Sequence, residues 1–163
     1  MLVLFLSVSV ILLDQATKHW AQRCLPSAPL TIVPGFFDLR HVLNTGAAWG
    51  MFAGYNTWLV GLSVAMLACL VVFRRCFFAD RLLHRWAMGL MVGGIVGNLT
   101  DRIRLQHVVD FLDFHWGGSH FPAFNVADSA ICVGVGLYLL SQAMPGERHV
   151  RTPDSGAGGD GKV

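Results

Sequence analysis

Charged residues are scarce in this sequence. Aspartate, glutamate, lysine and arginine make up only 13% of its 163 residues, against roughly 25% in soluble domains. Hydrophobic residues make up 54%, and the mean hydropathy is +0.54. A soluble protein of this length would have too few charges to cover its surface, and the many apolar residues exclude an intrinsically disordered chain. The composition therefore predicts an integral membrane protein.

Several functional motifs are also absent. The net charge is only +2, and no basic run is interleaved with aromatic residues, so we expect no nucleic-acid partner. The four cysteines form no CxxC pair and have no metal-ligand spacing, and neither HExxH nor GxSxG occurs. We therefore expect no metal and no cofactor. Cys69 and Cys132 lie in apolar runs and are expected to be buried thiols.

Apolar residues are concentrated in four segments. Each segment is long enough for a membrane helix when the polar residues at its ends are included in the helix. This pattern predicts an all-α membrane protein with four transmembrane helices. The segments run from Met1 to Gln22, from about Thr57 to Phe73, from about Leu82 to Asp101, and from about Asn125 to Met144.

Two groups of basic residues indicate the orientation of these helices. One group lies between the second and third segments and the other follows the fourth. By the positive-inside rule both are cytoplasmic, so both termini are predicted to be cytoplasmic. The groups are Arg74, Arg75, Arg81 and Arg85, and then Arg148, Arg151 and Lys162.

The remaining chain divides into a loop and a tail. Residues 1–145 are predicted to form a single four-helix domain, whose loop of about 24–56 lies on the extracytoplasmic side. This loop contains three prolines and the β-favouring run Leu30–Val33, so we expect a small β-like element together with an amphipathic helical piece on the membrane surface. Residues 146–163 are rich in glycine and polar residues and are predicted to be a disordered cytoplasmic tail.

The alternating directions of the helices bring polar residues to one end of the bundle, the extracytoplasmic end. Within each helix these residues are spaced three or four positions apart, so each set shares one helix face. A single carboxylate at a helix end is often only an interfacial residue, but several on three helices favour a functional polar site. The residues are Asp14 and Lys18 on the first helix, Asn98, Asp101 and Arg102 on the third, Asp110 in the connection, and Asn125 and Asp128 on the fourth.

A glycine stripe precedes this polar group on the third helix. Gly89, Gly93 and Gly97 recur every fourth residue, which lets another helix approach closely. Asn98 follows the stripe directly, so the polar group is predicted to face protein rather than lipid. Two aspartates brought together there would share one proton, and such a pair can activate water against a peptide carbonyl.

The same residues lie in five motifs that resemble lipoprotein signal peptidase, also called signal peptidase II. The resemblance covers the chain from about Asp14 to Leu140, and its specificity comes from five motifs in the same order. They are DQATK at 14–18, NTGAA at 44–48, GNLTDR at 97–102, VDF at 109–111 and FNVAD at 124–128.

This resemblance implies an aspartic endopeptidase of the bacterial inner membrane, multi-pass, with its active site toward the periplasmic face. Such enzymes remove signal peptides from prolipoproteins by cutting before a diacylglyceryl-modified cysteine, and the cyclic peptide globomycin inhibits them. A monomer is expected, because one chain carries the whole site. The resemblance implies Asp110 and Asp128 as the catalytic pair. It implies as support residues Asp14, Lys18, Asn44, Asn98, Asp101, Arg102 and Asn125.

Four nearby polar residues lie outside the motifs and are expected to be solvated loop residues: His107, Asp113, His115 and His120.

Three other function classes remain open on the residues alone. A small transporter or channel would use the carboxylates as a proton or cation site, but the inner halves of the helices are almost wholly apolar. A metal-dependent hydrolase would combine the aspartates with a loop histidine. An assembly subunit would use the glycine stripe and tolerate asparagine at both aspartates.

Overall fold

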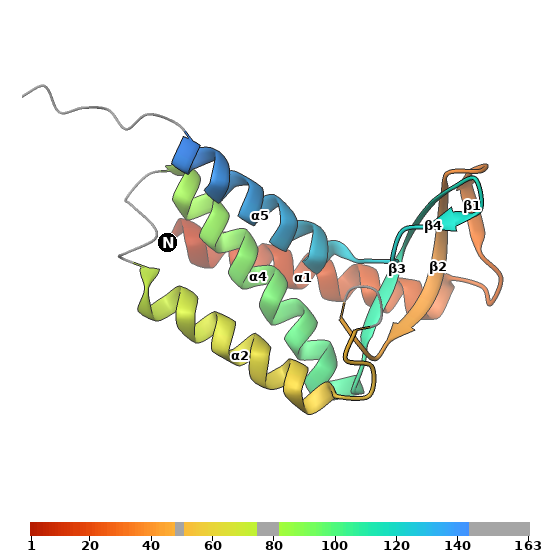
Figure 1. Cartoon of the computed structure of the whole chain (residues 1–163), viewed down its shortest axis with the longest axis horizontal. Helices are drawn as coiled ribbons and strands as arrows, with labels where there is room; N and C mark the ends of the chain where they lie inside the picture. The colour runs from red at the N-terminus through yellow and green to blue at the C-terminus, as the bar shows by residue number, and fades with distance from the viewer. Residues whose placement is uncertain (48–50, 75–81, 144–163) are drawn as a thin grey trace, which may run out of the picture.

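A computed structural model of the chain describes residues 1–47, 51–74 and 82–143, as four helices and a four-stranded sheet (Figure 1). Each helix lies within a few residues of a predicted apolar segment. The helices are α1 (Leu2–Cys24), α2 (Asn56–Val72), α4 (Leu82–Leu105) and α5 (Val126–Ala143), and the strands are β1 (Leu30–Val33), β2 (Phe37–Asn44), β3 (Val108–Trp116) and β4 (Ser119–His120).

The helices differ in how well they suit a membrane. Among the described residues, α1 and α5 are long and apolar enough to cross a bilayer. Helix α2 is apolar but shorter, with 17 residues. Helix α4 has 24 residues but carries charged side chains at both ends. The sequence and structure therefore agree on four helices, and four membrane spans with cytoplasmic termini stay a prediction.

Helix α4 is the centre of the bundle, with α1 and α5 packed along it and α2 on its other side (Figure 1). The predicted role of the glycine stripe is confirmed on the α1 side. A Cβ atom added at Gly89 would lie 2.8 Å from Cβ of Leu6, and one at Gly93 would lie 2.7 Å from Cβ of Val10. Two further glycines, Gly94 and Gly134, make the same close approach possible between α4 and α5.

The sheet projects beyond the end of the bundle where α1 ends and α5 begins (Figure 1). Its strands are antiparallel in the order β1-β2-β3-β4. The β-favouring run Leu30–Val33 is confirmed as β1. The predicted surface helix is not found at residues 45–47 and 51–54, which are bends and turns, and residues 48–50 lie outside the described chain.

Strand β3 was not anticipated from the sequence, which suggested only a connection between two helices. Helix α4 continues to Leu105, and Gln106 adopts a left-handed backbone with φ of 65°. The chain then turns into Val108–Trp116, where valine and phenylalanine residues favour an extended strand. This strand runs along β2 and carries Asp110 into the protein.

The expectation that Cys69 and Cys132 are buried is wrong. Both residues are exposed, as is Cys24. Cys69 is exposed on α2, and Cys132 lies where α5 borders a cavity between α2 and α5. The fourth cysteine, Cys76, lies outside the described residues, as do Arg75 and Arg81 and the predicted tail at 146–163.

The glycine stripe gives a direct test of this packing. Replacement Gly93→Ala places a methyl group 2.9 Å from the backbone oxygen of Ser7, so α1 must move away. We expect the free energy of unfolding to fall by about 1–3 kcal/mol, measured by thermal unfolding in detergent. Gly136→Ala is the matched control, because no atom beyond its own turn of helix backbone and its chain neighbours lies within 4 Å of the added methyl group. Equal stability of the two variants would contradict the packing described here.

Candidate active site

Asp110 lies near the start of β3, and its side chain is held by two amides. Asn44 Nδ2 at the end of β2 donates to one carboxylate oxygen at 2.9 Å. Asn125 Nδ2 donates to the other at 2.7 Å. The residue is only 1% exposed, so its carboxyl group is removed from bulk water and fixed in orientation.

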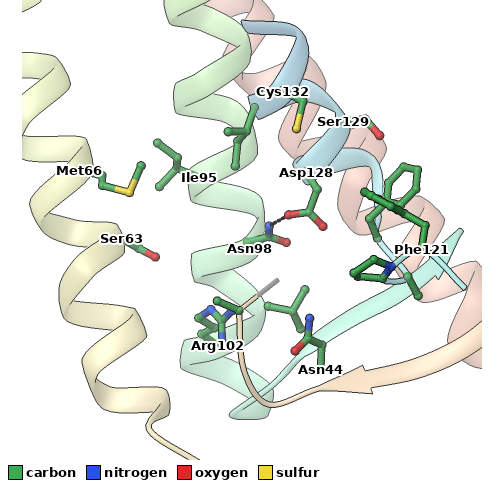
Figure 2. A pocket seen from close by; sticks show the side chains of 16 residues that line it. Asn44, Ser63, Met66, Ile95, Asn98, Arg102, Phe121, Asp128, Ser129 and Cys132 are labelled. Carbon is green, nitrogen blue, oxygen red and sulfur yellow. Dashed lines mark hydrogen bonds between the residues drawn. The ribbon is translucent and has the colours of Figure 1, made fainter. Parts of the chain in front are cut away.

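Asp128 lies in the first turn of α5 and takes part in a reciprocal cap of that helix. The backbone N–H of Asp128 donates to Asn125 Oδ1 at 3.0 Å, and the backbone N–H of Asn125 donates to Asp128 Oδ2 at 3.2 Å. This is the capping-box geometry, here with asparagine and aspartate. Asn98 Nδ2 on α4 donates to the remaining oxygen of Asp128 at 2.7 Å (Figure 2).

Asn125 thus links the two carboxyl groups, because its amide nitrogen contacts Asp110 and its amide oxygen contacts Asp128. The electrostatics of the pair reflect this proximity. Burial raises the pKa of Asp110 to about 7, and the negative charge of Asp128 adds to the increase. Hydrogen bonds from Asn44 and Asn125 act in the opposite direction but do not cancel it. One of the two neighbouring carboxyl groups therefore carries a proton near neutral pH.

A second polar cluster lies behind this pair, between α1, α4 and the start of α5. Lys18 Nζ forms ion pairs with Asp14 Oδ2 at 2.9 Å and with Asp101 Oδ2 at 2.8 Å. Asp14 also accepts the backbone N–H of Ala127 in the first turn of α5 at 2.9 Å. Asp101 accepts the backbone N–H of Val109 at 3.3 Å, next to Asp110. The cluster therefore fixes the backbone on both sides of the site.

Arg102 positions the segment that follows β2. Its Nη2 donates to the backbone oxygen of Gly46 at 2.7 Å, and Asn44 Oδ1 accepts the N–H of Gly46 at 2.9 Å. Asn56, at the start of α2, donates to the backbone oxygen of Arg102 at 3.0 Å. These contacts hold the Asn44 side chain beside Asp110.

A cavity of about 560 Å³ opens next to Asp128, between α2 and α5 with α4 as its floor (Figure 2). Asp128, Asn98 and Arg102 contribute its polar part. The rest is mainly apolar and extends along the helices away from the sheet. Its other lining residues include Ser63 and Met66 on α2, Ile95 on α4, Ile131 and Cys132 on α5, and Phe121 and Phe124 from the segment before α5.

Metal ligands do not gather here. Among residues 1–47, 51–74 and 82–143, no group of three histidine, cysteine, aspartate or glutamate side chains is arranged to hold a metal ion. The expected absence of a metal in the reaction is a separate prediction, which a chelator tests.

The structure brings all nine predicted residues to one end of the bundle and connects them by hydrogen bonds and ion pairs. Asp113 is different, because it was expected in a solvated loop and is only 1% exposed. Its carboxylate faces His120 Nδ1 at 3.0 Å and Arg40 Nε at 3.4 Å. The alternation of buried residues along a strand would have signalled this, but β3 itself was not predicted. The cavity residues of α2 and Phe121 also carried no sequence signal.

Comparison with known proteins identifies the family. The family model described as Signal peptidase (SPase) II matches residues 6–144. The chain belongs to the signal peptidase II family. Family membership makes it a protease, and the resemblance noted in the sequence is confirmed.

Individual relatives cover most of the chain. The lipoprotein signal peptidase of Syntrophotalea carbinolica is 48% identical, over 91% of this chain and 94% of its own length. That of Oleidesulfovibrio alaskensis is 44% identical, over 85% and 92%. A solved bacterial membrane enzyme superposes with a TM-score of 0.77 at 32% identity, covering 86% of this chain and 87% of its own. The fold is therefore that of a membrane enzyme.

The raised pKa of Asp110 predicts how stability depends on pH. Between its ordinary value of 3.8 and about 7, the folded protein keeps a proton that the unfolded chain has released, so the free energy of unfolding falls as pH rises through this range. Asp110→Asn removes this contribution. In thermal unfolding at pH 5 and pH 8, the variant should lose less stability than the wild type. Parallel losses in the two proteins would show that Asp110 does not titrate in this range.

Proposed function

We propose that this signal peptidase II family member is an aspartic endopeptidase that removes signal peptides from diacylglyceryl-modified bacterial prolipoproteins. The cut falls before the lipidated cysteine. One observation carries the proposal: two carboxyl groups, the buried Asp110 and the half-buried Asp128, are linked by Asn125 beside a mainly apolar cavity. The relatives named lipoprotein signal peptidase support the substrate class.

The proposed reaction uses a pair that holds one proton. The ionised carboxylate takes a proton from a water molecule as that water attacks the carbonyl carbon of the scissile peptide. The protonated partner donates a hydrogen bond to the carbonyl oxygen. When the tetrahedral intermediate breaks down, the C–N bond cleaves and a proton passes to the leaving amine. Asn44, Asn98 and Asn125 keep the two carboxyl groups oriented, so little reorganisation is needed at the moment of attack.

The cavity supports a lipid-modified substrate. Its polar end contains Asp128 and Arg102, and its apolar part runs between α2 and α5. A diacylglyceryl group cannot leave the bilayer without exposing its acyl chains to water. In our proposal, acyl chains lie along the apolar part and the scissile peptide reaches the polar end, where Asp14 and Lys18 support the site from behind.

The proposed placement is the bacterial inner membrane, with four spans, both termini cytoplasmic and the site at the periplasmic face. Support comes from Arg74, which follows the last residues of α2, and Arg85, which lies near the start of α4. The end of α2 and the start of α4 lie away from the sheet (Figure 1). We propose that residues 1–145 act as one domain, that the enzyme works as a monomer in the bilayer without metal or cofactor, and that globomycin inhibits it.

The decisive experiment compares Asp110→Asn and Asp128→Asn with wild type. Purified proteins in detergent are given a diacylglyceryl-modified prolipoprotein and excess EDTA, and product is followed by gel mobility. We expect the wild type to cleave and each variant to lose at least about a thousandfold in kcat, because neither proton transfer can proceed without the pair.

Asp113→Asn is the matched control. Asp113 is as buried as Asp110 and lies on the same strand, but it pairs with His120 and Arg40 instead of the site residues. It should keep kcat within a few fold. Cleavage by either site variant at the wild-type rate would refute the catalytic pair, and wild-type activity abolished by EDTA would favour a metal-dependent hydrolase.

The cavity gives a separate test of substrate binding. Cys132 lines the cavity four residues after Asp128, so Cys132→Trp fills part of the apolar region. We expect KM for the lipidated substrate to rise at least fivefold while kcat changes little. Cys69→Trp is the control, since Cys69 is also exposed on an apolar helix but does not line the cavity. An equal KM in both variants would place the lipid elsewhere.

A further inference from the structure

Lys18 touches neither carboxyl group of the proposed catalytic pair, but its ammonium group makes three close polar contacts. It lies 2.9 Å from Asp14 Oδ2, 2.8 Å from Asp101 Oδ2 and 2.8 Å from Asn98 Oδ1. The side chain is only 3% exposed, so water does not compete for these contacts. An ammonium group has three N–H donors and no acceptor. All three donors are therefore used, two by carboxylates and one by the Asn98 amide.

This arrangement determines which way the Asn98 amide faces. Because Lys18 can only donate, the atom of Asn98 facing it must be the oxygen. The amide nitrogen then points to the other side, where Asp128 Oδ1 accepts at 2.7 Å (Figure 2). Asn125 Nδ2 also donates to Asn98 Oδ1, at 3.2 Å. A rotated amide would set an NH₂ group against the ammonium and an oxygen against the Asp128 carboxylate, so both contacts would become repulsive.

We propose that Lys18 is a positioning residue for Asp128, which acts by holding the Asn98 amide in the one orientation that donates a hydrogen bond to that carboxylate. This inference rests on the proposed function, since it assigns Lys18 a role only if Asp128 takes part in proton transfer. Asp14 and Asp101 hold the ammonium in place. The ammonium fixes the Asn98 amide, and that amide donates to Asp128.

The test must separate this role from simple burial of charge. Lys18→Met alone leaves Asp14 and Asp101 without a cation, which is costly for a buried pair. A matched comparison avoids this problem: Asp14→Asn against the double variant Asp14→Asn/Lys18→Met. The introduced amide can still accept the N–H of Ala127 through its oxygen. Its NH₂ group then faces Lys18 in the single variant, where the ammonium keeps its contacts with Asp101 and Asn98. In the double variant Asp101 keeps the Gln15 amide as a donor at 2.9 Å. Both proteins keep the helix cap, and only one keeps the donor to Asn98.

Relative to Asp14→Asn, we expect the double variant to lose at least about tenfold in kcat, with KM for the lipidated prolipoprotein within twofold. The rising limb of its pH–kcat profile should move to higher pH, because the site loses a hydrogen-bond donor together with the positive charge of Lys18, which lowers the pKa of Asp110. Loss of the charge alone would move the profile without lowering kcat on its plateau. Lys18→Met, in the wild-type background, should show the same two changes. A purely structural role would lower thermal stability without moving the pH profile.

Gln15→Met is the control within the same cluster. Gln15 Nε2 donates to Asp101 at 2.9 Å but does not contact Asn98, so this variant should lose stability and keep the wild-type pH profile. The proposal is overturned if the two Lys18 variants keep the kcat and pH profile of their parents. Asp128→Asn is measured alongside: if it retains activity, the catalytic pair fails, whatever Lys18 does.

Discussion

One carboxylate, Asp14, connects three helices that are far apart in the sequence. It forms an ion pair with Lys18 on its own helix and accepts a backbone N–H at the start of α5. It also packs against Gly97 on α4, where an added Cβ atom would lie 2.7 Å from its Oδ2. A buried carboxylate is tolerated only when each oxygen has a partner, and these partners exist only when α1, α4 and α5 meet at the correct depth and rotation. The glycine stripe of α4 makes this approach possible. The geometry around Asp128 then follows, because the same first turn of α5 carries the cap formed with Asn125.

The sequence predicted the helices and the residues of the site well, and for a physical reason. Long apolar runs can only be satisfied as helices in a bilayer, and helices that alternate in direction must bring their like ends together. Residues as distant as Asp14 and Asp128 could therefore be assigned to one place without any knowledge of packing. Their roles in catalysis were suggested by resemblance, and these remain to be tested. The glycine stripe also indicated which face of α4 another helix approaches closely.

Strand β3 and the cavity could not be predicted in the same way. The segment after α4 is short and lies between two helices, so its pairing with β2 depends on contacts across about 70 residues of chain that no local pattern reports. This error led directly to the wrong environment for Asp113. The cavity depends on how far α2 stands from α5, a distance set by packing against α4. The exposed Cys69 and Cys132 show the related difficulty that an apolar run does not reveal which helix face meets protein and which meets lipid.

The contact between Asp14 and Ala127 spans 113 positions of the chain. Contacts of such long sequence separation form late in folding, after the intervening elements are in place. During synthesis the chain emerges from its N-terminus, so α1 and α4 are made while the cap of α5 and the Asn125 amide do not yet exist. Until then Asp110 lacks one of its two amide donors, and Asp128 is missing altogether. The site is thus completed only when α5 packs against α1 and α4, because a chain that stops before Asn125 lacks the link between the two carboxyl groups and one of the carboxyl groups itself.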